Sequence, residues 1–305
     1  GWRWHSPRAM VWPISERPTR VDLGPRASYG DIMVPGVSRQ FPVRRGAIPW
    51  EERSDPMKVT FIGGGKMAEA ILHGVLSGKL AGPKDISVGE PVAERREYLS
   101  SQFGVSTDAD NLKSANQADL VVIAVKPQDL GPVMGQLKGH LGSQQAALSI
   151  VAGAKMDTLT KGLDHQSVVR VMPNPPAQIG EGMSLWTCSD GVDESRREMV
   201  KAVLGTIGQE IYVADEKYMD MATALSASGP AYVFLFIEAL IDAGVYVGLP
   251  RDMARTMALQ TVFGSTKLVM ESGMHPAELK DMVVSPGGTT AEALLTMEEG
   301  GLRKV

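Results

Sequence analysis

Residues 59–71 read Val59-Thr60-Phe61-Ile62-Gly63-Gly64-Gly65-Lys66-Met67-Ala68-Glu69-Ala70-Ile71. An apolar run of strand-forming residues ends in glycines, and a helix-favouring run follows at once. The order Gly63-x-Gly65-x-x-Ala68 matches the dinucleotide-binding turn, with alanine in its third position. The first glycine permits a tight turn, the second lets the backbone approach a pyrophosphate, and the small third residue lets the helix lie close on the strand. The alternative is an ordinary glycine turn, which the flanking strand and helix patterns disfavour.

A pyrophosphate bound at this turn would lie at the N-terminus of the following helix. The free N–H groups there and the helix dipole both favour negative charge. We therefore predict a strand over about 57–62, a helix over about 66–77 and a cofactor-binding group at their junction. This group consists of Ile62, Gly63, Gly64, Gly65, Lys66 and Met67.

Further strand-like segments alternate with segments of helical pattern along the next part of the chain. They lie at 86–88, 119–125, 146–151 and 168–172. Continuous apolar runs such as the last three are typical of parallel strands that are buried on both faces. The alternation predicts an α/β fold with a doubly wound (Rossmann) parallel sheet over 57–216. Ligands of such sheets lie beyond the carboxyl ends of the strands, where Gly63, Glu90, Lys126, Gly153 and Asn174 fall.

The bulk composition narrows the classes of function. The 305 residues have room for about two domains, and a formal net charge of -4 argues against a nucleic-acid-binding protein. The single cysteine, Cys188, allows no internal disulfide and fits a reducing compartment, so we expect a cytoplasmic protein. The histidines lack zinc-type spacing, so no metal site is expected. The apolar run at 231–248 contains Glu238 and Asp242 and is short for a membrane span, so we expect a buried helix.

The two ends of the chain differ from this α/β part. Residues 1–56 are rich in Pro, Arg and Trp and lack a periodic pattern. We expect a disordered extension, or translated sequence upstream of a start at Met57; a small functional arm is the alternative. Residues 217–305 carry only helical patterns, with a kink expected at Ser228-Gly229-Pro230 because proline interrupts helical hydrogen bonding. The broad apolar faces of this helical domain predict burial against a partner chain.

Several segments of the chain match motifs of one enzyme family. They are Phe61-Ile62-Gly63-Gly64-Gly65-Lys66-Met67, Ala124-Val125-Lys126-Pro127, Arg170-Val171-Met172-Pro173-Asn174, Ser226-Ala227-Ser228-Gly229-Pro230-Ala231-Tyr232, and the region from His275-Pro276 to Val284-Ser285-Pro286-Gly287-Gly288-Thr289-Thr290. The first segment is shared with several dehydrogenase families, whereas the last is highly specific. From Met57 to its end, the chain resembles the pyrroline-5-carboxylate reductase family.

The resemblance implies a reductase that converts L-1-pyrroline-5-carboxylate, a cyclic imine, into L-proline with a hydride from NADPH or NADH. This is the last step of proline biosynthesis. The resemblance also implies a cofactor-binding first domain and a helical domain that forms a homodimer, with larger rings of dimers common in the family. The expected substrate group is Ser228, Ser285, Gly287, Gly288, Thr289 and Thr290. Further cofactor contacts are expected at Glu90, Asn111, Ala124, Val125, Lys126, Pro127, Ala152, Gly153 and Asn174.

Two residues are expected to assist the chemistry. Thr290 lies near the start of a helix whose N–H groups suit the substrate carboxylate, and by resemblance its hydroxyl serves the ring nitrogen. The alternative is a helix cap, since Thr289 with Glu292 resembles a capping box. Lys126 ends the central strand and would order the nicotinamide side of the site or bind carbonyls; a solvated lysine is the alternative. Hydride transfer needs no acid–base pair, because the cofactor carries the hard chemistry.

Two polar residues bear on the adenosine side of the cofactor. Asn111 follows Asp110 in a loop where the family places a cofactor-contacting asparagine, and the alternative is a helix cap. Glu90 ends the second strand, where an acid accepts a hydrogen bond from a ribose 2′-OH. Such a carboxylate would repel the 2′-phosphate of NADP, although Arg95 and Arg96 are near enough in sequence to serve that phosphate instead. We expect NADH to be usable.

The chain departs from the family pattern in three respects. Pro175 stands where the family has a threonine, so no hydroxyl is available there. Residues 1–56 have no family counterpart. Family members continue for about one helix beyond Val305, and we expect this difference to weaken the dimer.

Two other functions remain open on the sequence. A beta-hydroxyacid dehydrogenase shares the glycine turn and a helical second domain, but it relies on a lysine of the interdomain helix, and residues 223–234 contain none. A regulatory protein that binds a dinucleotide without turnover would keep Gly63 and Gly65, yet it would not need the loop at 285–290.

Overall fold

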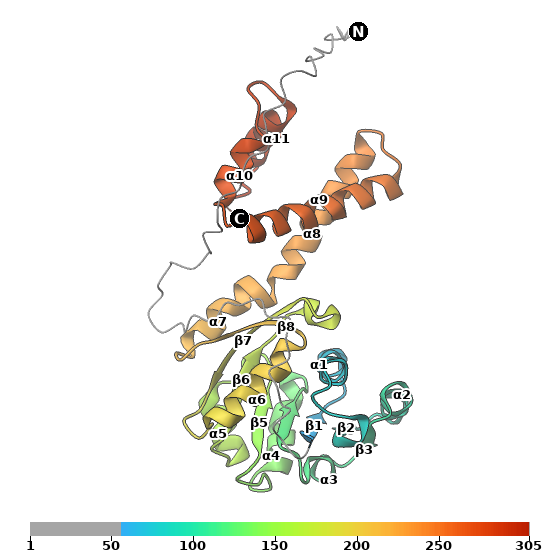
Figure 1. Cartoon of the computed structure of the whole chain (residues 1–305), viewed down its shortest axis with the longest axis vertical. Coiled ribbons are helices and arrows are strands. Elements are labelled where there is room, and N and C mark those ends of the chain that lie inside the picture. Colours follow the sequence, from blue (N-terminus) through green and yellow to red (C-terminus); the bar gives the residue numbers. More distant parts are fainter. Residues whose placement is uncertain (1–55, 305) are drawn as a thin grey trace. The chain divides into compact units, whose positions relative to one another are not determined.

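The computed structural model describes residues 56–304, so the expectation of a disordered extension before Met57 falls almost wholly outside the described residues. These residues divide into two compact units, 56–258 and 259–304, and each is described by itself (Figure 1). The limit between the units lies within helix α9 (Arg251–Ser272). The sequence-based limit near residue 216 stays a prediction.

The first unit is built on one eight-stranded sheet with the order β3-β2-β1-β4-β5-β6-β7-β8. The strands are β1 (Val59–Ile62), β2 (Ile86–Gly89), β3 (Ser106–Asp108), β4 (Leu120–Ile123), β5 (Ala146–Ser149), β6 (Val168–Met172), β7 (Gly182–Cys188) and β8 (Gly208–Tyr212). Neighbours from β3 to β6 are parallel, β7 runs antiparallel to β6, and β8 is parallel to β7. The first six positions follow the order of doubly wound dinucleotide-binding folds. The predicted fold class is confirmed.

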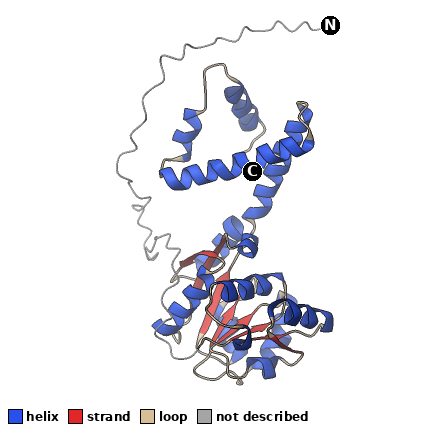
Figure 2. Ribbon diagram, turned by 45° about the vertical axis from the view of Figure 1, so that its right-hand side comes forward, coloured by secondary structure: helices blue, strands red, loops and turns tan. Residues whose placement is uncertain are grey.

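Helices cover both faces of this sheet (Figure 2). They are α1 (Lys66–Ser77), α2 (Ala93–Phe103), α3 (Asn111–Ala115), α4 (Leu130–Leu137), α5 (Met156–Leu163) and α6 (Glu194–Gly205). Alternate residues of β4 divide between the two layers. Leu120 and Val122 pack with α1, α2 and α6, whereas Val121 and Ile123 pack with α3, α4 and α5. Burial on both faces is the reason why this strand is a continuous apolar run.

The helical region begins with α7 (Lys217–Ala222), continues through a π-helical turn, η5 (Thr223–Ala227), and passes into α8 (Gly229–Tyr246). The kink predicted at Ser228-Gly229-Pro230 follows this turn, in which the Ser228 N–H donates to the Thr223 carbonyl at 2.9 Å. The second unit holds the remainder of α9, then α10 (Pro276–Met282) and α11 (Thr289–Glu299). The predicted helical character of the region is therefore confirmed.

The stretch Lys217–Tyr246 corrects one sequence-based argument. It is helical over 30 residues, and an 18-residue window within it has a mean hydropathy of 1.6, which among the described residues makes it the one helix long and apolar enough to cross a membrane by length and composition. The helix is thus longer than the run at 231–248 on which the sequence argument rested. None of the residues of α8 is buried within the single chain, so the expected burial is not provided by the chain itself.

Candidate cofactor and substrate site

Gly63 makes the turn that follows β1. Its φ of +93° lies in the region that favours glycine, and its N–H donates to the Gly89 carbonyl at 2.7 Å. A Cβ at this position would lie 2.8 Å from the carbonyl oxygen of Ala124 and 3.0 Å from a methyl carbon of Val125. The turn therefore requires glycine on both conformational and steric grounds.

The peptide groups of Gly64 are held from both sides by the segment that follows β2. Its N–H donates to Glu90 Oε2 at 2.8 Å, and its carbonyl accepts from Arg95 Nε at 2.6 Å. Arg95 also pairs with Glu69 of α1. Partial burial raises the pKa of Glu69, but hydrogen bonds from Arg95 and Tyr98 outweigh burial, so this pKa lies below its ordinary value. The glycine turn is thus braced by charged side chains of β2 and α2.

The N-terminus of α1 is open for an anion. Gly65 is the N-cap, with no side-chain hydrogen bond at the cap, so the first amides of the helix keep their donors. A Cβ built on Gly65 would meet nothing within 4 Å. Lys66 and Met67 form the first helical turn, and Ala68 is buried against the sheet. A cavity of about 230 Å³ beside α1 includes Lys66 but no other residue of the predicted cofactor group.

Glu90 lies at the carboxyl edge of the sheet, as predicted. Both of its carboxylate oxygens accept hydrogen bonds from backbone N–H groups. Oε2 accepts from Gly64, and Oε1 accepts from the Val92 N–H at 3.0 Å. Arg96 donates to the carbonyls of Glu90 and Pro91. Each carboxylate oxygen has a second lone pair, so the ribose contact of Glu90 stays a prediction beside its observed bracing role.

Asn111 is not a helix cap. Asp110 is the N-cap of α3 and accepts from the N–H groups of Leu112 and Lys113, whereas Asn111 is the first helical residue. The Asn111 amide donates to Gln136 Oε1 at 2.7 Å. Its Oδ1 is buried and has no hydrogen-bond partner among the described residues. A buried acceptor that lacks a donor indicates a group that a ligand would satisfy.

The remaining predicted cofactor residues lie at the same carboxyl edge. Ala124 and Val125 follow β4 directly, and Lys126 with Pro127 opens the short helix η3 (Pro127–Asp129), with the Lys126 side chain exposed. Ala152 and Gly153 follow β5, and Gly153 adopts a φ of +76°. These placements agree with the sequence-based site, while the individual contacts stay predictions.

Asn174 lies two residues beyond β6 and is engaged at both ends of its amide. Its Oδ1 accepts from the Met183 N–H at 2.8 Å, and its Nδ2 donates to the Ser226 carbonyl at 3.2 Å. The side chain therefore links the sheet edge to η5. Ser228, which was expected to serve the substrate, follows this turn and caps it.

The predicted substrate loop belongs to the second unit. The Gly288 N–H donates to the Ser285 carbonyl at 3.0 Å, and Gly287 has a φ of +65°. Gly288 is the N-cap of α11 and no side chain caps this helix, so the predicted capping box of Thr289 and Glu292 is wrong. Thr289 and Thr290 occupy the first two helical positions, with Thr290 half-buried. The N–H groups of Thr289 and Thr290 remain free for an anion, because the glycine N-cap offers no side-chain acceptor.

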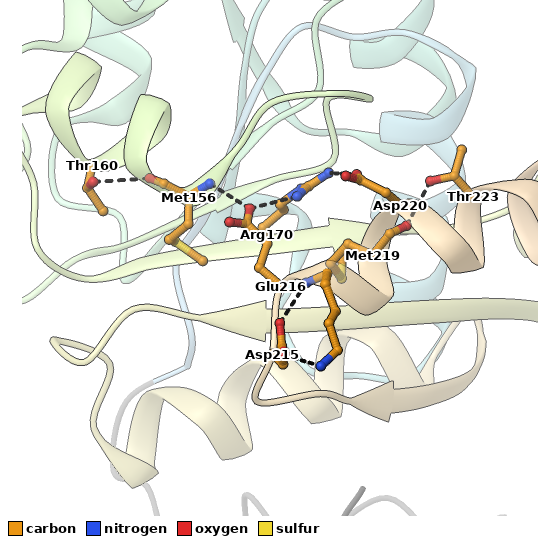
Figure 3. A network of polar contacts seen from close by, with 9 residues as sticks. Met156, Thr160, Arg170, Asp215, Glu216, Met219, Asp220 and Thr223 are labelled. Carbon is orange, nitrogen blue, oxygen red and sulfur yellow. Dashed lines mark hydrogen bonds and ion pairs between the residues drawn. The ribbon is translucent and has the colours of Figure 1, made fainter. Parts of the chain in front are cut away.

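A buried polar network was missed in the sequence. Arg170, 2% exposed, pairs with Glu216 at 2.6 Å and with Asp220 at 3.1 Å (Figure 3). Glu216 also accepts from the Met156 N–H at 2.7 Å. The signal was the single charge inside the apolar run Val168-Val169-Arg170-Val171-Met172. A buried guanidinium requires carboxylate partners. An arginine inside an apolar strand therefore predicts ion pairs with acidic residues elsewhere in the chain.

The residues at this edge fit a dinucleotide cofactor. The glycine turn leaves an open approach at Gly65, the first turn of α1 keeps free amides, and Asn111 presents an unsatisfied buried acceptor. A pyrophosphate suits the first two features, and an acceptor near the end of β2 suits the hydroxyl and amino donors of an adenosine. The predicted cofactor class, NADPH or NADH, is consistent with these features.

Comparisons with known proteins point to one family. A family model described as pyrroline-5-carboxylate reductase dimerisation matches residues 216–305, and one described as NADP oxidoreductase, coenzyme F420-dependent, matches residues 58–153. A pyrroline-5-carboxylate reductase of Synechocystis sp. is 41% identical over 247 residues, which cover 81% of this chain and 92% of the relative. The Escherichia coli K12 reductase is 38% identical, with 81% of this chain and 91% of the relative covered.

Solved structures agree with these relatives. A pyrroline-5-carboxylate reductase of Coxiella burnetii superposes with a TM-score of 0.75 at 33% identity, covering 82% of this chain and 93% of the other. A Plasmodium falciparum pyrroline carboxylate reductase with NADP bound has the same TM-score and identity, with 81% and 92% covered. Identity at this level over most of both chains, together with the braced glycine turn and the helical segment after residue 216, shows that the chain belongs to the pyrroline-5-carboxylate reductase family.

Proposed function

We propose that this chain reduces L-1-pyrroline-5-carboxylate to L-proline by hydride transfer from NADPH or NADH, the last step of proline biosynthesis. The observation that carries the proposal is the 41% identity to a reductase of this name over 81% of the chain. The braced turn at Gly63 and Gly64 and the open helix N-terminus at Gly65 support a dinucleotide cofactor.

Different residues of the chain bind the cofactor, bind the substrate and orient the imine. A bound nicotinamide cofactor supplies the hydride. The turn Gly63–Gly65 and the amides of α1 hold its pyrophosphate, and Lys126 orders the site beyond β4. The free amides of Thr289 and Thr290 bind the substrate carboxylate, and the Thr290 hydroxyl donates to the ring nitrogen. These contacts orient the imine carbon for transfer, and positioning is the main requirement of this chemistry.

We infer that NADH is usable, because the Glu90 carboxylate at the end of β2 disfavours a 2′-phosphate. We infer a homodimer, or a ring of such dimers, because α8 exposes Tyr232, Val233, Phe234, Leu235 and Phe236. An apolar helix of this kind suits a partner chain rather than a nucleic acid or a membrane, and the cytoplasm remains the proposed location.

The direct test is an imine-reduction assay. Purified protein is mixed with pyrroline-5-carboxylate and either NADPH or NADH, and loss of reduced-nicotinamide absorbance is followed together with formation of proline. The same protein is assayed with a 3-hydroxy acid and the oxidised cofactors, the reaction of the dehydrogenase alternative. Proline formation supports the proposal; turnover of the hydroxy acid alone, or cofactor binding with no turnover, would replace it.

A further inference from the structure

The helical segment around Pro230 contains a carbonyl that the helix cannot satisfy. In an α-helix, the N–H of each residue donates to the carbonyl four residues earlier, so the Ser226 carbonyl would be served by residue 230. Proline has no N–H. The next amide, that of Ala231, donates to the Ser228 carbonyl at 3.0 Å instead. The Ser226 carbonyl therefore needs a donor from outside its own helix.

Asn174 provides this donor. Its Nδ2 lies 3.2 Å from the Ser226 carbonyl oxygen and 3.4 Å from Ser226 Oγ. The orientation of the amide is fixed from its other end, because Oδ1 faces the Met183 N–H at 2.8 Å and only an oxygen accepts there. Asn174 is 9% exposed, so water competes little for these bonds.

The same contact joins two parts of the site. Asn174 follows β6 at the carboxyl edge of the sheet, and Ser226 lies in η5, two residues before Ser228. η5 is a π-helical turn, a feature that frequently occurs at functional sites. A fixed turn keeps the backbone of Ser228 at one place beside this edge, whereas an unsatisfied Ser226 carbonyl would turn toward water.

We propose that Asn174 is a positioning residue, which holds the Ser226–Ser228 turn in register with the carboxyl edge of the sheet by supplying the hydrogen bond that Pro230 cannot. This role differs from the cofactor contact that the sequence suggested for Asn174. Its kinetic consequence rests on the proposed reductase activity, since displacement of the turn would disturb the alignment of imine and nicotinamide.

The first experiment measures steady-state kinetics of Asn174→Ala with pyrroline-5-carboxylate. A misplacement of about 1 Å in an active site lowers the rate by about a hundredfold, so we expect kcat to fall by about ten- to a hundredfold while KM for the cofactor changes by less than about twofold. The isotope effect with deuterated reduced cofactor should rise, because hydride transfer becomes rate-limiting. Asn116→Ala makes the same chemical change at an exposed residue after α3 and serves as the matched control.

The second experiment restores the missing donor. Pro230→Ala returns an N–H that can donate to the Ser226 carbonyl. In the Pro230→Ala background, Asn174→Ala should therefore lower kcat by less than about threefold. A double-mutant cycle measures this coupling between the two positions. Equal losses in both backgrounds, or a raised cofactor KM with unchanged kcat in Asn174→Ala, would overturn the proposal. If Asn174→Ala fails to fold, Asn174→Asp replaces it, because it keeps the acceptor for Met183 and loses the donor for Ser226.

A third measurement separates this proposal from the reductase assignment. Amide hydrogen exchange of peptides that cover residues 223–236 should be faster in Asn174→Ala than in the parent protein, and the Pro230→Ala background should remove the difference. If the parent protein does not reduce the imine, the proposed function fails while the exchange data still decide the hydrogen bond. Unchanged exchange in Asn174→Ala would refute the positioning role even in an active enzyme.

Discussion

At the scale of single residues, Glu90 has an observed bracing role beside the ribose contact that the sequence predicts. A carboxylate after the second strand suggested a ribose contact. In the structure the same carboxylate also accepts from the backbone of Gly64 and Val92 and fixes the glycine turn. A substitution at this position is therefore expected to change both cofactor selectivity and the order of the turn.

Glu90→Ser is expected to raise the ratio of kcat/KM for NADPH over NADH by about tenfold, which corresponds to about 1.4 kcal/mol. The physical reason is the loss of a negative charge next to the site of a 2′-phosphate. Efficiency with both cofactors should also decline, because Gly64 loses its acceptor. Glu90→Gln removes the charge with little change of shape and is the control. An unchanged ratio in both variants would show that Glu90 has no part in cofactor choice.

Thr290 is a second test at the scale of one side chain. Because Gly288 is the N-cap of α11, the hydroxyl of Thr290 is not needed to cap the helix. Thr290→Ala should lower kcat/KM for the imine by about ten- to a hundredfold, the effect of a lost hydrogen bond worth about 1.5–3 kcal/mol. Cofactor affinity and Tm should barely change. Thr296→Ala, the same substitution at an exposed position later in α11, is the control.

The opposite pattern would assign Thr290 a structural role. Unchanged efficiency with a stability loss of about 1 kcal/mol, as for a lost cap, would mean that the hydroxyl supports the helix and does not serve the substrate. Kinetics and thermal unfolding of the same two preparations therefore decide between the two roles.

At the scale of elements, the sequence predicted the strands at the centre of the sheet but missed β7, although five of its seven residues are buried. β1, β4, β5 and β6 lie in the middle of the sheet, and their apolar runs follow directly from burial on both faces. β3 was missed because it is a short edge strand, Ser106-Thr107-Asp108, that carries no apolar signal. β8 is another edge strand with half-buried side chains. Edge strands need less apolar surface, so composition reveals them poorly.

Only part of the candidate site was predictable, because local sequence patterns reveal backbone conformation but not contacts between distant segments. Positions that depend on backbone conformation, such as Gly63, were evident because only one residue type fits them. Contacts between distant segments were not evident. The bond from Asn174 to Ser226 and the pairing of Arg170 with Glu216 join residues about fifty positions apart, and local patterns hold no information on such pairs.

The Arg170 network gives a prediction for this scale. Glu216→Ala removes the 33% exposed partner of a buried guanidinium and the acceptor of the Met156 N–H, so it should lower the free energy of unfolding by about 3 kcal/mol. Asp220 is 67% exposed, and Asp220→Ala should cost less than about 1 kcal/mol. Urea unfolding at one fixed protein concentration measures both. Equal losses would show that the guanidinium is held by both carboxylates alike.

At the scale of the whole molecule, the exposed apolar surface of α8 favours association with a second copy of the chain. α8 is long, apolar and without a buried residue in the single chain. Contiguous exposed apolar patches mark interaction surfaces. The residues from 216 onward also match a dimerisation family model. A homodimer would cover these side chains in the way that symmetric oligomers cover matching surfaces.

Charge placed on α8 should therefore dissociate the assembly. Phe234 and Leu235 are 60% and 67% exposed in the single chain, and burying a carboxylate at either position without a partner is costly. The double variant Phe234→Glu, Leu235→Glu is expected to sediment as a monomer in analytical ultracentrifugation, whereas the parent protein sediments as a dimer or a multiple of it. Ile179→Glu, at a 79% exposed position of the short helix η4 (Pro175–Ile179), is the matched control and should leave the mass unchanged. A parent protein that is monomeric, or a double variant with the parent's mass, would mean that α8 is covered by something other than a second copy.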